Sequence, residues 1–200
     1  MATTTETTVV YAAGVVQGIA LVTFPAASTI LTDPAEYDLS STQYGTLFLP
    51  QVVTAITAAL LGATLSGRFG AKKVYLAGLF AGLVSMGLLL VSALFAGDAG
   101  AYALLLLATA SLGVGFGLTV PALNTLAAAF HPGAADRAIL VLNALLGFGT
   151  VLAPVFVAVF VGLGFWWGLP LTSATLLALL VTVSLGLPLR AQIGRAASRG

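Results

Sequence analysis

The chain has no cysteine and very few charged residues. Of its 200 residues 6% are charged, and seven Lys and Arg against six Asp and Glu leave a net charge of +1. Disulfides, thiolate chemistry and Cys-ligated metals are therefore excluded, and the single histidine, His131, cannot build a metal site alone. Nucleic acid requires a dense basic face, which this charge balance does not provide. Soluble domains carry about 25% charged residues, so the composition also excludes an ordinary water-soluble globule.

Long apolar runs take up most of the sequence, which is 60% hydrophobic. About 20 helical residues cross roughly 30 Å of hydrocarbon, and the runs lack the alternation of lipid-facing strands. Residues 1–10 lack the positive start of a signal peptide, so the first run is expected to be retained. We predict an all-α membrane protein, a single domain over 1–200, whose six transmembrane helices cover residues 9–31, 43–66, 73–96, 101–129, 137–163 and 166–188.

All Lys and Arg residues fall in or beside alternate gaps between these helices or at the C-terminus, and most of the acidic residues fall in the other gaps. Lys and Arg mark cytoplasmic loops, so we expect a multi-pass protein of the cell (inner or plasma) membrane with both termini in the cytoplasm. The cytoplasmic cations are then Arg68, Lys72, Lys73, Arg137, Arg190, Arg195 and Arg199. The acidic residues of the opposite gaps are Asp33, Glu36, Asp38 and Asp98. Aromatic residues near the predicted helix ends fit an interfacial belt: Tyr11 and Tyr75 inside, and Tyr37, Tyr44, Tyr102, Trp166 and Trp167 outside.

Two parts of the chain repeat one another. Gly14-x-x-x-Gly18 precedes a Pro-Ala-x-polar-Thr string that begins at Pro25, and Gly113-x-x-x-Gly117 precedes a second such string at Pro121, 96 positions later. The copies lie on the first and fourth predicted helices, which cross the membrane in opposite directions, so residues 101–188 are expected to repeat residues 9–96 in inverted orientation. Inverted three-helix repeats are typical of secondary transporters. The alternative is a chance match between apolar helices rich in Gly, Ala and Pro.

The segment after the second predicted helix reads Leu65-Ser66-Gly67-Arg68-Phe69-Gly70-Ala71-Lys72-Lys73. It resembles the loop signature G-x-L-x-D-R-x-G-R-K of the major facilitator superfamily of transporters. Arg68, Gly70 and Lys72 match its Arg, its second Gly and its final basic position, and Lys73 follows directly. Gly67 stands where the family has an Asp that latches the loop, so the resemblance does not carry that contact over.

Further strings match the family in the same order. Residues 112–117, followed by Pro121, resemble its Gly-rich fourth helix; residues 149–154 resemble its fifth-helix G-x-x-x-G-P string; and residues 165–170 resemble the aromatic start of its sixth helix. The family fold has two six-helix halves, and this chain resembles the N-terminal half. The resemblance implies a natural half-size protein that forms a homodimer, one of two subunits that needs a second six-helix half, or a shortened form of a longer protein.

Uncharged polar residues are the candidates for contact with a solute. No ionisable group lies deep in a predicted helix, which disfavours proton coupling and strongly charged substrates. Amides donate and accept hydrogen bonds and suit neutral polar solutes such as sugars. The alternative is that these amides join helices to one another, a contact worth around 1 kcal/mol. The predicted substrate-binding residues are the amides Gln17, Gln51, Asn124 and Asn143, together with the aromatic Phe24, which lies seven residues after Gln17 and so on the same face of the first predicted helix.

The sequence therefore predicts a secondary-type transporter without cofactor or metal, whose partners are the lipid bilayer, a small-molecule solute and either a second copy of the chain, in a homodimer, or a second six-helix half. It would move a small neutral polar solute by alternating access. Efflux of apolar compounds, or a non-transporting half-domain that pairs with a partner subunit, are the alternatives. No His or Asp lies at membrane depth, so an intramembrane enzyme is not expected.

Overall fold

The computed structural model of the chain describes residues 2–189, which form helices and connecting turns with no strand among them. Five helical stretches are long and apolar enough to cross a membrane, and this makes the chain a multi-pass membrane protein. Each stretch begins and ends within three residues of a predicted transmembrane helix. They are Ser41–Phe69 (α4, Ser41–Thr46, and α5, Phe48–Phe69), Ala71–Phe95 (α6, Ala71–Ser92, and η1, Ala93–Phe95), Ala99–Phe130 (α7), Ala135–Gly162 (α8) and Gly168–Gly186 (α9).

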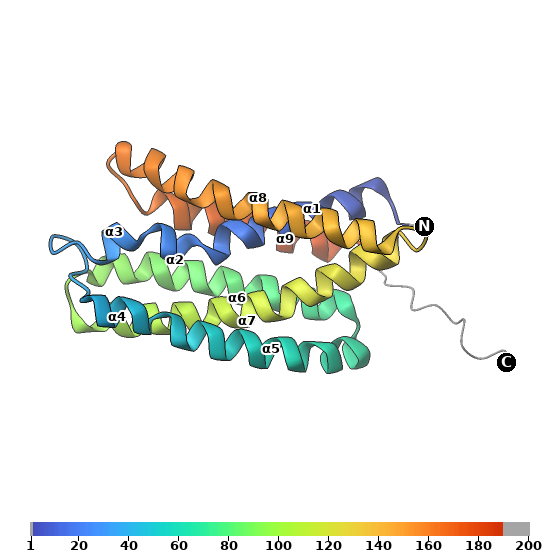
Figure 1. Cartoon of the computed structure of the whole chain (residues 1–200), viewed down its shortest axis with the longest axis horizontal. Coiled ribbons are helices and arrows are strands. Elements are labelled where there is room, and N and C mark those ends of the chain that lie inside the picture. The colour runs from blue at the N-terminus through green and yellow to red at the C-terminus, as the bar shows by residue number, and fades with distance from the viewer. Residues whose placement is uncertain (1, 190–200) are drawn as a thin grey trace.

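The first predicted transmembrane helix, residues 9–31, is three helical pieces. α1 (Thr4–Leu21), α2 (Thr23–Ala26) and α3 (Ser28–Leu31) follow one another along the bundle (Figure 1). The breaks fall at Val22 (φ −100°, ψ 10°) and Ala27 (φ −84°, ψ 12°). Between them lies Pro25, which has no N–H to donate to the preceding turn. With its break after Leu21 and with Glu6 near its start, α1 does not reach the length and hydropathy of the five stretches above.

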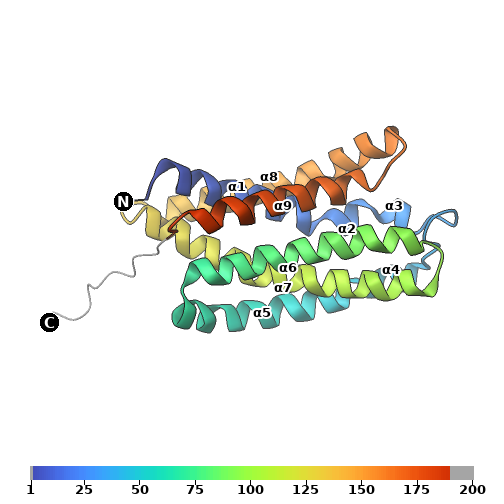
Figure 2. The same cartoon turned by 180° about the vertical axis from the view of Figure 1, so that it is seen from behind.

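The bundle consists of two groups of three long helices. α5, α6 and α7 form one group, in which α7 packs against both of the others, and α1, α8 and α9 form the second, in which α1 packs against α8. Figure 2 shows α9 from behind, where it lies against α6 and joins the two groups. Large buried side chains from both groups and from α2 share one core, including those of Phe24, Tyr75, Met86, Leu126, Leu142 and Leu177.

The Lys and Arg of the described residues lie at one end of the bundle, and four of the six acidic residues lie at the other. The end that carries the N-terminus, the α5–α6 turn and the α7–α8 turn (Figure 1) holds Arg68, Lys72, Lys73 and Arg137, and we call it the basic end. The other, acidic end holds Asp33, Glu36, Asp38 and Asp98. Arg190, Arg195 and Arg199 lie outside the described residues. The assignment of the basic end to the cytoplasm stays a prediction.

Two of the predicted belt residues are buried instead of lying at a membrane surface. Tyr75 is 0% exposed, and its hydroxyl lies 3.1 Å from the Ser184 hydroxyl, which links α6 to α9. Tyr37 is 4% exposed, lies 2.8 Å from the Ser92 hydroxyl and packs edge-on to Trp166. The belt interpretation is therefore wrong for Tyr37 and Tyr75, because both rings stabilise helix and loop packing inside the bundle.

Candidate solute site on α1, α7 and α8

The close packing of α1 on α8 shows where Gln17 lies along the length of the bundle. Gly14 faces Leu142 of α8, and a Cβ on Gly18 would lie 2.0 Å from the carbonyl oxygen of Leu146. The two helices therefore run in the same direction in close backbone contact, as small residues allow. Gln17 lies between these two glycines on α1, so it is level with the turn of α8 that contains Asn143.

Asn124 of α7 and Asn143 of α8 lie beside one another. Asn143 Nδ2 donates to Asn124 Oδ1 at 3.5 Å, and it also donates to the carbonyl oxygen of Ile139, one turn earlier, at 2.9 Å. A distance of 3.5 Å is long for a hydrogen bond, so the contact between the two amides is weak. Asn143 is exposed and Asn124 is half-buried, which leaves both side chains open to a further partner.

Asn143 is exposed at a depth where lipid would be a poor neighbour. α8 has 28 residues and is therefore about 42 Å long, some 12 Å more than the roughly 30 Å hydrocarbon layer. Asn143 is the ninth residue of α8 and lies about 12 Å along it, inside the hydrocarbon of a centred helix. Its Nδ2 is bonded to the Ile139 carbonyl oxygen, but its Oδ1 accepts no hydrogen bond from the described residues, and a polar group left unpaired in hydrocarbon costs several kcal/mol. This face of α8 is therefore better suited to water, a solute or a second protein surface than to lipid.

Gln17 is buried and lacks a partner. It is 2% exposed, and its Nε2 makes no hydrogen bond in the described residues. Buried polar atoms in folded proteins are nearly always bonded, so the Gln17 amide has an unused donor at the level of Asn143. Three of the predicted substrate-binding residues, Gln17, Asn124 and Asn143, thus lie close in depth on three neighbouring helices.

The other two predicted substrate-binding residues lie elsewhere. Phe24 is 0% exposed and belongs to the core, away from any surface. Gln51 is half-buried on α5, where its carbonyl oxygen contacts Gly113 of α7 and its Oε1 has no partner within the described range. Gly113 precedes Asn124 by eleven residues on α7, so about 16 Å of helix separates Gln51 from the amide pair.

The predicted loop motif forms the turn between α5 and α6. Arg68 is exposed in the last turn of α5, and Gly70 ends that helix with φ +87°, a conformation that favours glycine. The Lys72 ammonium reaches across to α9, where it donates to the carbonyl oxygens of Leu185, at 3.0 Å, and Leu187. A cation suits the carbonyl end of a helix, so Lys72 fastens the motif to the end of α9. Lys73 is exposed beside it.

Glu6 makes a second connection at the basic end that the sequence reading did not identify. Its carboxylate accepts from the backbone N–H of Thr3 at 2.8 Å and from that of Leu189 at 3.0 Å. These bonds, with that of Thr3 first, lower the pKa of Glu6, which lies before the first predicted transmembrane helix. Thr3-x-x-Glu6 has the spacing of a capping box, which predicts the start of α1; the contact with Leu189 has no local signal.

Comparison with known proteins gives no assignment: no family model matches the chain, and no curated protein matches it.

Proposed function

We propose that the chain is a six-helix transporter half of the major facilitator type, which moves a small neutral polar solute, such as a sugar, by alternating access. The observation that carries the proposal is the exposed amide of Asn143, with Asn124 beside it and Gln17 at the same level. A polar face inside the membrane-spanning part of a helix is expected where a helix lines a solute pathway.

The proposal takes α1, α2 and α3 together as a sixth crossing. α1 begins at the basic end, α3 ends at the acidic end, and α4 begins beside it (Figure 1). Broken helices are common at the solute sites of secondary transporters, where unwound backbone can meet a ligand. Six crossings also bring both ends of the described chain to the basic end.

The packing of the two Gly-x-x-x-Gly motifs supports an inverted repeat. Gly14 and Gly18 of α1 pack on α8, and Gly113 and Gly117 of α7 pack on α5. The second contact is about as close as the first, because a Cβ added to Gly113 would lie 2.2 Å from the Gln51 carbonyl oxygen. In both pairs the helices run in the same direction, and the first helix of one triplet contacts the second helix of the other. The turns that follow α5 and α8 contain Gly70 at φ +87° and Gly164 at φ +84°, respectively.

The least buried helices support a partner half. In α5 (with α4) and in α8, 17% of the most apolar stretch is buried, against 44% in α6 and in α7. These two helices belong to different groups of the bundle, and α8 carries the exposed Asn143. A homodimer or a second six-helix half that covers α8 and the exposed face of α5 with Val53, Ile56 and Leu60 would close the amide face into a cavity. We expect the native mass in lipid nanodiscs to correspond to two copies or to a complex with a second half.

Transport of labelled neutral monosaccharides into proteoliposomes tests the proposal. We expect saturable uptake, and Asn143→Leu should raise KM about fivefold, because one hydrogen bond is worth around 1 kcal/mol. Ala144→Leu is the matched control, since Ala144 is an exposed neighbour on α8 without a polar group. No uptake of any sugar by folded protein, alone and with a candidate second half, would refute it. Export of an apolar dye that is unaffected by Asn143→Leu would favour the efflux alternative.

A further inference from the structure

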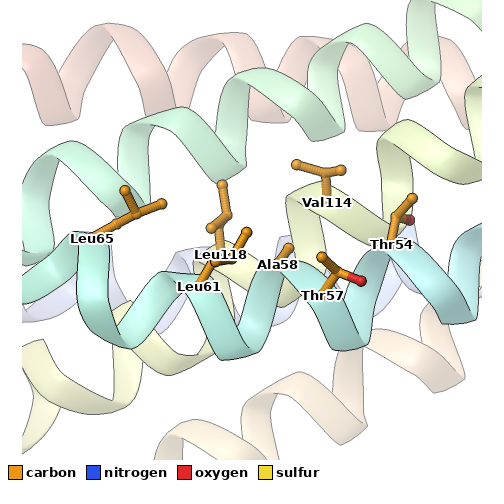
Figure 3. Close-up of a pocket in the computed structure, with 7 residues that line it drawn as sticks. All are labelled: Thr54, Thr57, Ala58, Leu61, Leu65, Val114 and Leu118. Atoms are coloured by element: carbon orange, nitrogen blue, oxygen red, sulfur yellow. The ribbon is translucent and has the colours of Figure 1, made fainter.

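An apolar groove runs along the outside of the bundle where α5, α6 and α7 meet. Its larger part, about 280 Å³, lies between α5 and α7, with Leu65 at one end of the row of lining side chains and Thr54 and Val114 at the other (Figure 3). Its smaller part, about 180 Å³, continues to Phe69 and Lys73 at the basic end. Leu65 and Leu118 line both parts, so the two are one continuous groove.

The groove is apolar along its length and cationic at one end. Thr54 and Thr57 are the hydroxyl residues in its lining, and each already donates to a carbonyl oxygen of its own helix, that of Pro50 and that of Val53 respectively. The hydrocarbon part therefore offers no unused donor to a polar ligand. Lys73 is the charged residue among the lining side chains.

The Lys73 charge is available to an external anion. Lys72 beside it is held by the α9 carbonyl oxygens, whereas Lys73 is exposed and no ion pair or hydrogen bond holds its ammonium within residues 2–189. Arg68, next to Phe69 at the same turn, is also exposed. The aliphatic stem of a lysine can cover apolar surface while its ammonium stays at the membrane surface.

We propose that this groove binds one anionic phospholipid of the surrounding bilayer. One acyl chain lies along Leu65, Leu118 and Val114, and the phosphate lies at Lys73 with Arg68 beside it. The proposal rests on the membrane setting of the bundle and is independent of the solute and of the transport mechanism. A basic residue near the membrane surface contributes about 1 kcal/mol to anionic lipid binding, which corresponds to roughly fivefold in affinity.

Lipid binding to the purified full chain tests this proposal, with dioleoyl phosphatidylglycerol and dioleoyl phosphatidylcholine as probes in native mass spectrometry. We expect the chain to retain phosphatidylglycerol at least about fivefold better. Lys73→Gln should remove most of that preference. Arg137→Gln, at the same end but away from the groove, should leave it unchanged.

The position of the acyl chain needs a second pair of variants. Ala77→Phe fills the groove from an exposed position on α6 and should lower the retention of both lipids. Ala63→Phe adds the same ring at an exposed position of α5 that does not line the groove and should have no effect. Thermal unfolding establishes that each variant is folded, and Lys73→Gln tests the headgroup contact if Ala77→Phe does not fold.

The proposal would be overturned by equal retention of the two lipids, by an unchanged preference in Lys73→Gln, or by unchanged binding in folded Ala77→Phe. Equal retention of dioleoylglycerol, which has no phosphate, would identify the groove as a general apolar surface and would overturn it as well.

Discussion

Replacement of Gly149 by alanine should separate α1 from α8. A Cβ at Gly149 would lie 2.1 Å from the carbonyl oxygen of Val15 and 3.1 Å from the Cα of Gly18. Backbone atoms cannot turn aside as a flexible side chain can, so the two helices must move apart by about 1 Å, and contacts along their whole interface weaken. Gly147 is two residues away on the same helix, and a Cβ there would meet nothing within 4 Å. Gly147→Ala is therefore the matched control.

The expected loss is about 2 kcal/mol for Gly149→Ala, the middle of the range for overpacked interiors. Alanine also favours a helix over glycine by up to about 1 kcal/mol, but this gain is common to both variants and cancels in their comparison. For a chain of this size, 2 kcal/mol corresponds to a Tm about 4–8 °C lower. Thermal unfolding in one detergent, followed by circular dichroism, measures the difference. A Gly149→Ala variant as stable as Gly147→Ala would refute the close contact between α1 and α8.

Three further changes test the connections to α9 and to the residues that follow it. Lys72→Met should lower Tm, because it leaves the carbonyl oxygens of Leu185 and Leu187 without their cation. Lys73→Met is the control and should leave Tm unchanged. Equal effects of the two substitutions would argue against a stabilising contact between Lys72 and the end of α9. Tyr75→Phe should lower the free energy of unfolding by about 1–2 kcal/mol, because it leaves the buried Ser184 hydroxyl unpaired. In a double-mutant cycle measured by thermal unfolding, adding Ser184→Ala should lower it little further. Fully additive effects of the two substitutions would contradict the hydrogen bond. The lowered pKa of Glu6 means that its contribution to stability is present above its ordinary pKa of 4.5 and is lost as pH falls through the lower, folded-state value. Wild type should therefore lose stability below pH 4.5 more steeply than Glu6→Gln in a pH series of melts, and parallel curves would contradict this.

The positions of the long helices were predictable from the sequence, because the thickness of the hydrocarbon layer sets the length of a membrane-spanning helix and charged residues in the loops mark where each helix ends. The break of the first helix near Pro25 was not predictable from the sequence. Pro121 begins a similar local string, yet it lies inside the continuous helix α7. A proline interrupts or bends a helix according to how neighbouring helices satisfy the freed backbone groups, and this depends on packing that a local string does not encode. Tyr75 shows the same limit, because an aromatic near a helix end fits either a membrane surface or a buried contact.

The candidate site was predictable by residue type more than by position. Amide chemistry indicated Gln17, Asn124 and Asn143, and these three lie at a similar depth in the bundle. Helical spacing also grouped Phe24 with Gln17, but the chain breaks at Val22 between them, so the helical phase does not carry across and Phe24 packs into the core. The contact between Glu6 and Leu189 joins residues 183 positions apart and could not be inferred from either segment alone.

Labelling of single cysteines from one side of the membrane tests the six-crossing arrangement directly, because the natural chain has no cysteine. Thr4→Cys, Ala35→Cys and Gly133→Cys each place a thiol at an exposed position, at the first residue of α1, after α3 and between α7 and α8, respectively. With a membrane-impermeant maleimide on oriented vesicles, we expect Thr4→Cys and Gly133→Cys to react from the same side and Ala35→Cys to react from the other. Reaction of Thr4→Cys and Ala35→Cys from the same side would mean that α1, α2 and α3 do not cross the bilayer, and it would contradict the inverted repeat and the transporter built on it.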